Sequence, residues 1–212
     1  MRLNTPTLSR ISSALLLGSL LLSALPSQAD VLTTSYSSNN TRRGFMFDIV
    51  TTNALTITSF DINVASGVST AFSVYYKSGS WSGWQFDPSA WTLLGTQTIT
   101  SAGTDHATTL DVADLSLAAG VTEGLFITTD GSVASSMRYI TGGTTYTNDD
   151  LSILPGAGTL QPFAGSLATP RTFSGAIHYT LDALPAQVPE PSSGLLVTLA
   201  LGGLAGLRRR AH

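Results

Sequence analysis

The chain has 212 residues, enough for one ordinary domain with its own hydrophobic core, and its formal net charge is −3. It contains no cysteine, which excludes disulfides, thiol catalysis and cysteine-based zinc sites. Residues 30–188 carry five basic and twelve acidic residues, and this balance argues against a nucleic-acid-binding protein, which needs clustered lysine and arginine.

The N-terminal segment predicts a cleavable signal peptide over residues 1–29. A basic n-region with Arg2 and Arg10 precedes an apolar h-region, residues 11–25. Small residues at the positions that signal peptidase reads place the cleavage before Asp30. We therefore expect signal peptidase to act on the chain during export through the inner membrane.

Residues 30–181 predict an all-β domain, a single antiparallel β-sandwich of jelly-roll-like type, and residues 182–187 a linker. Thr, Ser, Gly and Asp dominate, and short runs of alternating apolar residues are separated by turn residues. About ten short strands at this spacing fit a sandwich. A barrel would give the same pattern and stays open.

The predicted strands are residues 44–50, 55–64, 72–77, 91–94, 97–100, 107–112, 124–129, 137–140, 151–154 and 172–181. In the second of them the apolar residues change parity after Ile57, which predicts a bulge or corner near Ser59. Residues 113–120 fit either a strand followed by a turn or one turn of helix.

A long loop from Ser78 to Pro88 has an unusual aromatic content, with Trp81, Trp84 and Phe86 in it. Tyr75 and Tyr76 precede it and Trp91 follows it; side chains of adjacent strand residues point to opposite faces, so one tyrosine lies outside the core. Because exposed aromatics stack on sugar rings or bury into a partner, Trp81, Trp84 and Tyr75 are candidate glycan-binding or partner-binding residues. The alternative is that Trp84 and Trp91 fill one end of the sandwich as core.

Enzymatic chemistry has little support in the sequence. His178 falls within a predicted strand, His106 lies in a loop, and no G-x-S-x-G nucleophile elbow is present. We therefore predict a protein that is not an enzyme, with an unrecognised hydrolase as a lesser alternative. Threonine-rich strands suggest ice binding as a further alternative, but no threonine ladder repeats at a fixed period.

No cofactor is expected, although a structural calcium is allowed. Asp149 and Asp150 are the candidate ligands, because calcium accepts carboxylate oxygens from loops, but their spacing is not that of an EF-hand. The other interpretation is that they are solvated acids of a turn.

The C-terminal segment combines three features: Val188-Pro189-Glu190-Pro191, then fourteen uncharged residues at 194–207, then Arg208-Arg209-Arg210. The two prolines hold the tetrapeptide extended. Fourteen residues are fewer than the roughly twenty that a membrane-spanning helix needs, but snorkelling arginines bring the run close to that length. The arginine triplet predicts a cytoplasmic C-terminus with the domain across the membrane, in agreement with the signal peptide.

This module, residues 188–212, resembles the PEP-CTERM sorting signal of Gram-negative bacteria in its tetrapeptide, short transmembrane helix and arginine cluster. The resemblance implies processing by exosortase, a membrane-embedded transpeptidase that would cut near the tetrapeptide and release or transfer the domain to the cell exterior. It also implies an association with exopolysaccharide and the biofilm matrix. The body is similar to a β-sandwich module of secreted bacterial proteins, for instance at residues 44–48 and 74–79.

The resulting hypothesis is an exported, non-enzymatic protein of the cell surface or extracellular matrix, anchored transiently in the inner membrane and processed by exosortase. The alternative is a carbohydrate-binding module that acts on exopolysaccharide. The expected partners are signal peptidase, exosortase and, for the alternative, exopolysaccharide.

Overall fold

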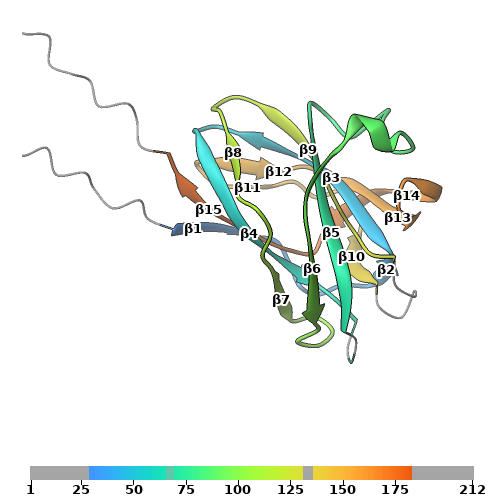
Figure 1. The fold of residues 1–212 in the computed structure, drawn as a ribbon. Helices are drawn as coiled ribbons and strands as arrows, with labels where there is room; N and C mark the ends of the chain where they lie inside the picture. The colour runs from blue at the N-terminus through green and yellow to red at the C-terminus, as the bar shows by residue number, and fades with distance from the viewer. Residues whose placement is uncertain (1–28, 66, 68, 131–135, 183–212) are drawn as a thin grey trace, which may run out of the picture.

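The computed structural model describes residues 29–65, 67, 69–130 and 136–182 (Figure 1). Within these residues the regular elements are β-strands, apart from one turn of 3-10 helix, η1 (Pro88–Ala90). All pairs of named strands are antiparallel, and they form two sheets. The expected all-β, antiparallel class is confirmed, and the jelly-roll-like connectivity stays a prediction.

The smaller sheet has five strands, in the order β1 (Ala29–Thr33), β15 (Gly175–Leu181), β4 (Leu55–Asn63) and β7 (Ala107–Leu110), with β8 (Leu115–Leu117) also paired to β4. Strand β8 settles the ambiguity of residues 113–120 in favour of a strand. Ala29 of β1 pairs with Thr180 of β15, so both ends of the described domain lie side by side (Figure 1).

The larger sheet has ten strands. Its main path is β2 (Asn40–Arg42), β10 (Met137–Thr141), β14 (Ala164–Phe173), β13 (Gly156–Gln161), β3 (Gly44–Thr51), β9 (Thr122–Thr128), β5 (Ser69–Ser78) and β6 (Thr92–Thr100). Strand β12 (Leu151–Ile153) pairs with β3, and β11 (Tyr146–Thr147) pairs with β12. The aromatic loop therefore connects β5 to β6 at one edge of this sheet.

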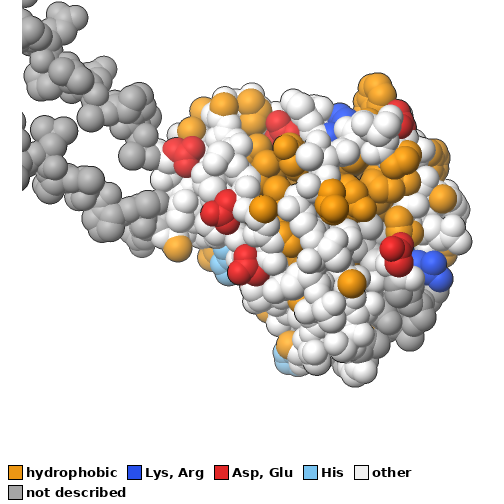
Figure 2. All heavy atoms as spheres, in the orientation of Figure 1, with side chains coloured by type: hydrophobic (Ala, Val, Ile, Leu, Met, Phe, Trp, Pro, Cys, Tyr) orange, Lys and Arg blue, Asp and Glu red, His pale blue; other side chains and the backbone are white. Residues whose placement is uncertain are grey.

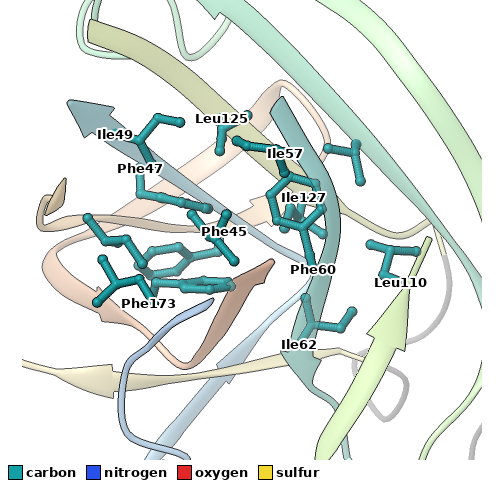
Figure 3. Packing of buried hydrophobic residues seen from close by; sticks show 14 of the residues in the cluster. Phe45, Phe47, Ile49, Ile57, Phe60, Ile62, Leu110, Leu125, Ile127 and Phe173 are labelled. Carbon is teal, nitrogen blue, oxygen red and sulfur yellow. The ribbon is translucent and has the colours of Figure 1, made fainter. Parts of the chain in front are cut away.

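The main core lies between the two sheets and takes side chains from both (Figure 3). Alternation along β3 points Phe45, Phe47 and Ile49 inward, and all three are fully buried. Phe47 stacks on Phe173 of β14, with ring centroids 4.6 Å apart. Burial of these rings supplies the dominant favourable free energy of a domain that has no disulfide.

The bulge expected near Ser59 is confirmed. Ser59 pairs with His178 and Ile57 with Tyr179, so Thr58 is the extra residue of β4. Leu55 and Ile57 before the bulge, and Phe60 and Ile62 after it, therefore all face the core.

The strand expected over residues 172–181 is divided at Ser174. Strand β14 ends in the larger sheet at Phe173, and β15 begins in the smaller sheet at Gly175. Ser174 is fully buried, donates its hydroxyl to the Ser35 carbonyl at 2.8 Å and accepts from the Asn63 amide at 3.1 Å. These bonds fix the corner at which the chain changes sheets, a device typical of packed sheets.

Candidate functional site

The aromatic loop, residues 79–91, is a folded element with its own backbone hydrogen bonds. The Trp84 amide donates to the Trp81 carbonyl at 3.0 Å, and the Asp87 amide donates to the Trp84 carbonyl at 3.2 Å. Asp87 caps η1 by accepting from the Ser89 amide at 3.0 Å. Gly83 has φ of +92°, a conformation that a side chain would strain.

Two buried charged side chains anchor the loop to the larger sheet. Asp48 of β3 accepts from the Ser80 hydroxyl at 2.6 Å and from the Trp81 amide at 2.8 Å. Lys77 of β5 donates Nζ to the carbonyls of Ser78 at 2.6 Å and Ser80 at 2.9 Å. Charge-assisted bonds of this kind are stronger than neutral ones, so the loop is held in one position.

Gly124 of β9 makes room for the loop. A Cβ at this position would lie 2.9 Å from the Trp81 backbone nitrogen and 3.1 Å from Cγ of Lys77. Any larger residue would therefore push the loop away from the sheet and break its hydrogen bonds to Asp48.

Beneath the loop lies a second hydrophobic cluster, on the outer face of the larger sheet. We call it the outer cluster; its buried members are Met46, Trp91 and Phe126, with Tyr75, Trp81, Ala90 and Phe163 packed against them. Phe163, at the turn between β13 and β14, meets Phe126 edge-on with centroids 5.0 Å apart. Trp91 donates its indole N–H to the Trp84 carbonyl at 2.9 Å, which joins the cluster to the loop.

Two aromatic side chains of the loop project into solvent; we call Trp84 and Phe86 the exposed pair. Trp84 is 48% exposed and Phe86 52%. Leu93 of β6, 52% exposed, is the cross-strand partner of Tyr75. Figure 2 shows hydrophobic side chains gathering over this part of the molecule.

The structure separates the three residues that the sequence grouped as binding candidates. Trp84 is exposed, whereas Trp81 and Tyr75 are half-buried in the outer cluster. The expected opposition of the tyrosines is confirmed, because Tyr76 packs against the main core. Trp91 is core as the alternative held, but Trp84 is not. Phe86, which the sequence did not group with the binding candidates, is exposed as well. Its place in the loop, two residues after Trp84, was the signal that could have identified it.

The side chain of Lys77 lies against one face of the Trp84 ring. Its Nζ lies 5.6 Å from the centroid of the Trp84 ring, within cation–π range, and the residue is only 9% exposed. One face of the indole therefore contacts a buried charge.

Glu123 of β9 lies close to this anchor. It pairs across the sheet with Ser78 and is 8% exposed, and its Oε2 is buried without a hydrogen-bond partner. Burial raises the pKa of Glu123, although the hydrogen bond with Ser78 and the charge of Lys77 act in the opposite direction.

The candidate calcium ligands lie elsewhere, before β12. Asp149 is exposed, and Asp150 accepts hydrogen bonds from Asn53 at 2.8 Å and from the Tyr179 hydroxyl at 2.8 Å. Burial, and next the bond to Asp150, raise the pKa of Tyr179 to about 12. Both Asp150 oxygens are thus engaged, and the described residues hold no group of three or more His, Cys, Asp or Glu side chains placed for a metal ion.

The two histidines of the described residues, His106 and His178, lie in different surroundings. Nε2 of His178 lies 2.7 Å from Oδ2 of Asp61 on the neighbouring strand β4, and Thr109 donates to the other Asp61 oxygen at 2.8 Å. This is a cross-strand pair on the smaller sheet. His106 is exposed at the end of the turn before β7.

The predicted terminal signals lie outside the described residues. These are the signal peptide apart from Ala29, the tetrapeptide 188–191, the apolar run 194–207 and the arginines 208–210. Within the part of the chain that the structure describes, no helix is long and apolar enough to cross a membrane.

Comparison with known proteins identifies the C-terminal segment. Residues 187–210 match the family model described as the PEP-CTERM protein-sorting motif, and they include the tetrapeptide and all three arginines of the cluster. No curated protein matches the chain. The chain thus carries a PEP-CTERM sorting motif behind an antiparallel β-domain, which supports an exported protein that exosortase sorts and processes.

Proposed function

We propose that the β-domain is a non-enzymatic component of the cell surface or extracellular matrix, delivered there after exosortase has processed the sorting motif. The observation that supports this is the adjacency of the domain's two ends, since Asp30, the first residue after the predicted cleavage, pairs with Tyr179 near the end of β15. Both predicted terminal signals are attached to the same end of the fold. The remainder of the domain therefore extends away from the membrane while either signal is still attached.

The test is fractionation of cells that express the tetrapeptide variant Pro189→Ala/Glu190→Ala/Pro191→Ala. The wild-type protein is expected to be shortened and recovered outside the inner membrane, and the variant to stay at full length in the membrane. Pro185→Ala, just before the matched segment, is the control and should behave as wild type. Equal size and location for the wild type and the triple variant would overturn the processing step.

The exposed pair favours a second function for the same domain, the binding of glycan. Trp84 and Phe86 keep about half of their surface in solvent on a loop that is anchored at Asp48 and Lys77. A pre-positioned aromatic ring binds the apolar face of a sugar without a large ordering cost. An exopolysaccharide of the matrix is the glycan that such a domain would meet.

Glycan binding is tested by affinity electrophoresis through soluble polysaccharides with wild type, Trp84→Ala and Phe86→Ala. The function is supported if a polysaccharide retards the wild type and the apparent affinity falls at least tenfold in each variant. Val31→Ala is the matched control, because Val31 is 47% exposed on β1 of the other sheet. Equal retardation of Trp84→Ala and wild type, or retardation of neither, would contradict it.

A further inference from the structure

The charges around the exposed pair restrict the kind of glycan that it can take. Acidic polysaccharides are bound through lysine and arginine side chains that reach their carboxylates or sulfates. The described residues contain five such side chains, Lys77 and four arginines. The question is which of the five reaches the exposed pair with its charge available.

Lys77 is the cation closest to Trp84, and its ammonium group is already engaged. It donates to two carbonyls at 2.6 and 2.9 Å, lies under the indole and is 9% exposed. Its charge is also attracted to the buried carboxylate of Glu123. Two of its three N–H donors are bonded and the indole lies over the group, so a ligand carboxylate reaches Lys77 only if the indole or the loop moves.

The arginines of the named strands lie toward the other edge of the larger sheet. Arg42, Arg138 and Arg171 belong to β2, β10 and β14, whereas the loop joins β5 to β6. Within the sheet, four strand spacings separate β14 from β5, on the order of 20 Å. This exceeds the Debye length of about 8 to 10 Å at physiological salt, so Arg138 and Arg171 are screened from the loop. Arg42 lies nearer, beside the turn that places Phe163 against Tyr75, and it donates Nη1 to the Ser166 hydroxyl at 3.2 Å.

Arg43 is remote along the other direction of the sheet. It immediately precedes β3, and its carbonyl accepts from the Thr129 amide at the far end of β9. Asp48, which anchors the loop, is five residues further along β3, or about 17 Å at the rise of a strand. Arg43, Arg138 and Arg171 are therefore remote from the exposed pair, and Arg42 is engaged with Ser166.

The polar groups near the exposed pair suit sugar hydroxyls instead. Asp87 accepts from Ser89 through Oδ1, and its second carboxylate oxygen remains an acceptor. Gln85 accepts from the Gly83 amide through Oε1 at 2.8 Å, which leaves its amide nitrogen to donate. These groups present hydrogen bonds, and Asp87 adds a negative charge next to the exposed pair.

Resting on the glycan-binding function proposed above, we propose that the aromatic loop takes uncharged polysaccharide and discriminates against acidic polysaccharide. Trp84 and Phe86 supply the contact with the sugar face, and Gln85 and Asp87 the hydrogen bonds. Lys77 is a positioning residue for Trp84 and does not contact the ligand. The carboxylate of Asp87 repels uronic acid chains.

The test compares laminarin and galactomannan, which are neutral, with alginate and hyaluronan, which are acidic, using the full exported protein at physiological salt. We expect Trp84-dependent binding of a neutral polysaccharide that is at least tenfold tighter than binding of either acidic one. Trp84-dependent binding of an acidic polysaccharide with equal or higher affinity overturns the selectivity and leaves the glycan function standing. Absence of Trp84-dependent binding to all four overturns both.

A gain-of-function variant makes the charge argument independent of loop stability. Ser82 is exposed in the loop, and only its backbone amide bonds to Ser80, at 3.1 Å. Ser82→Lys adds an unengaged cation and should raise alginate affinity at least tenfold, an effect that disappears when salt is raised to about 500 mM. Ser82→Gln is the size-matched control. Unchanged alginate affinity in Ser82→Lys would contradict the proposal.

Discussion

Phe47 and Trp91 are both buried, yet they belong to hydrophobic clusters on opposite faces of the larger sheet. Phe47 lies in the main core, where strands of both sheets contribute, and its neighbour Phe173 comes from a strand. Trp91 lies in the outer cluster, where the loop 79–91 and the turn with Phe163 fold over the sheet.

Under the proposed glycan-binding function, stability and recognition lie on opposite faces of the larger sheet. The main core is closed on both sides, so a change there affects the whole fold. The outer cluster is covered only by a loop and a turn, and it exposes the pair Trp84 and Phe86 at its surface. Loops that carry function on a rigid scaffold commonly have this arrangement.

The largest effect on stability is expected from Phe47→Ala. The side chain is fully buried and stacked on Phe173, so its removal leaves a cavity between the sheets. We expect the free energy of unfolding to fall by about 4 to 5 kcal/mol. Chemical denaturation followed by circular dichroism measures it, and a loss below about 1 kcal/mol would show that the core is not where the stability lies.

A smaller and more local effect is expected from Trp91→Ala. The loop can relax into the space, so the loss should be about 2 to 3 kcal/mol. Hydrogen exchange should accelerate in residues 79–91 while the amides of β3 keep their protection. Trp91→Phe is the control, because it keeps the ring and loses only the indole bond to the Trp84 carbonyl. Loss of protection throughout β3 would instead show that the two clusters unfold as one cooperative unit.

Glu123→Gln should reveal a pH-dependent cost at the boundary of the two clusters. Burial raises its pKa above the unfolded value of about 4.5, so the folded state binds the proton more tightly than the unfolded chain. The destabilisation by the ionised group is absent below the unfolded pKa and develops as pH rises through the folded pKa. The stability of Glu123→Gln relative to wild type should therefore increase between pH 4 and pH 7, whereas an equal difference at both pH values would contradict this assignment.

The main core was predictable because alternation reports it directly. Phe45, Phe47 and Ile49 recur with a period of two, and the change of parity after Ile57 predicted a bulge near Ser59, which the structure places at Thr58. The division at Ser174 was not predictable, because the alternation continues across it. Only the buried contacts of Ser174 with Ser35 and Asn63 define the corner.

The outer cluster was predictable only in part. The aromatic content of the loop identified Trp84, but alternation cannot tell a half-buried Trp81 or Tyr75 from an exposed one. The hairpin of β13 and β14 was missed, because glycine, alanine and threonine dominate it and give no apolar period. Its turn carries Phe163, whose φ of +52° sequence patterns do not indicate.

The most direct test measures affinity for a neutral polysaccharide and the free energy of unfolding on the same preparation of Trp84→Ala. Because Trp84 is 48% exposed but packs on the Lys77 ammonium, we predict an unfolding free energy within about 1 kcal/mol of wild type, with affinity lowered at least tenfold. Trp84→Phe should recover part of that affinity. Unchanged affinity, or a loss of affinity that occurs only together with a loss of stability, would contradict the separation of recognition from the core.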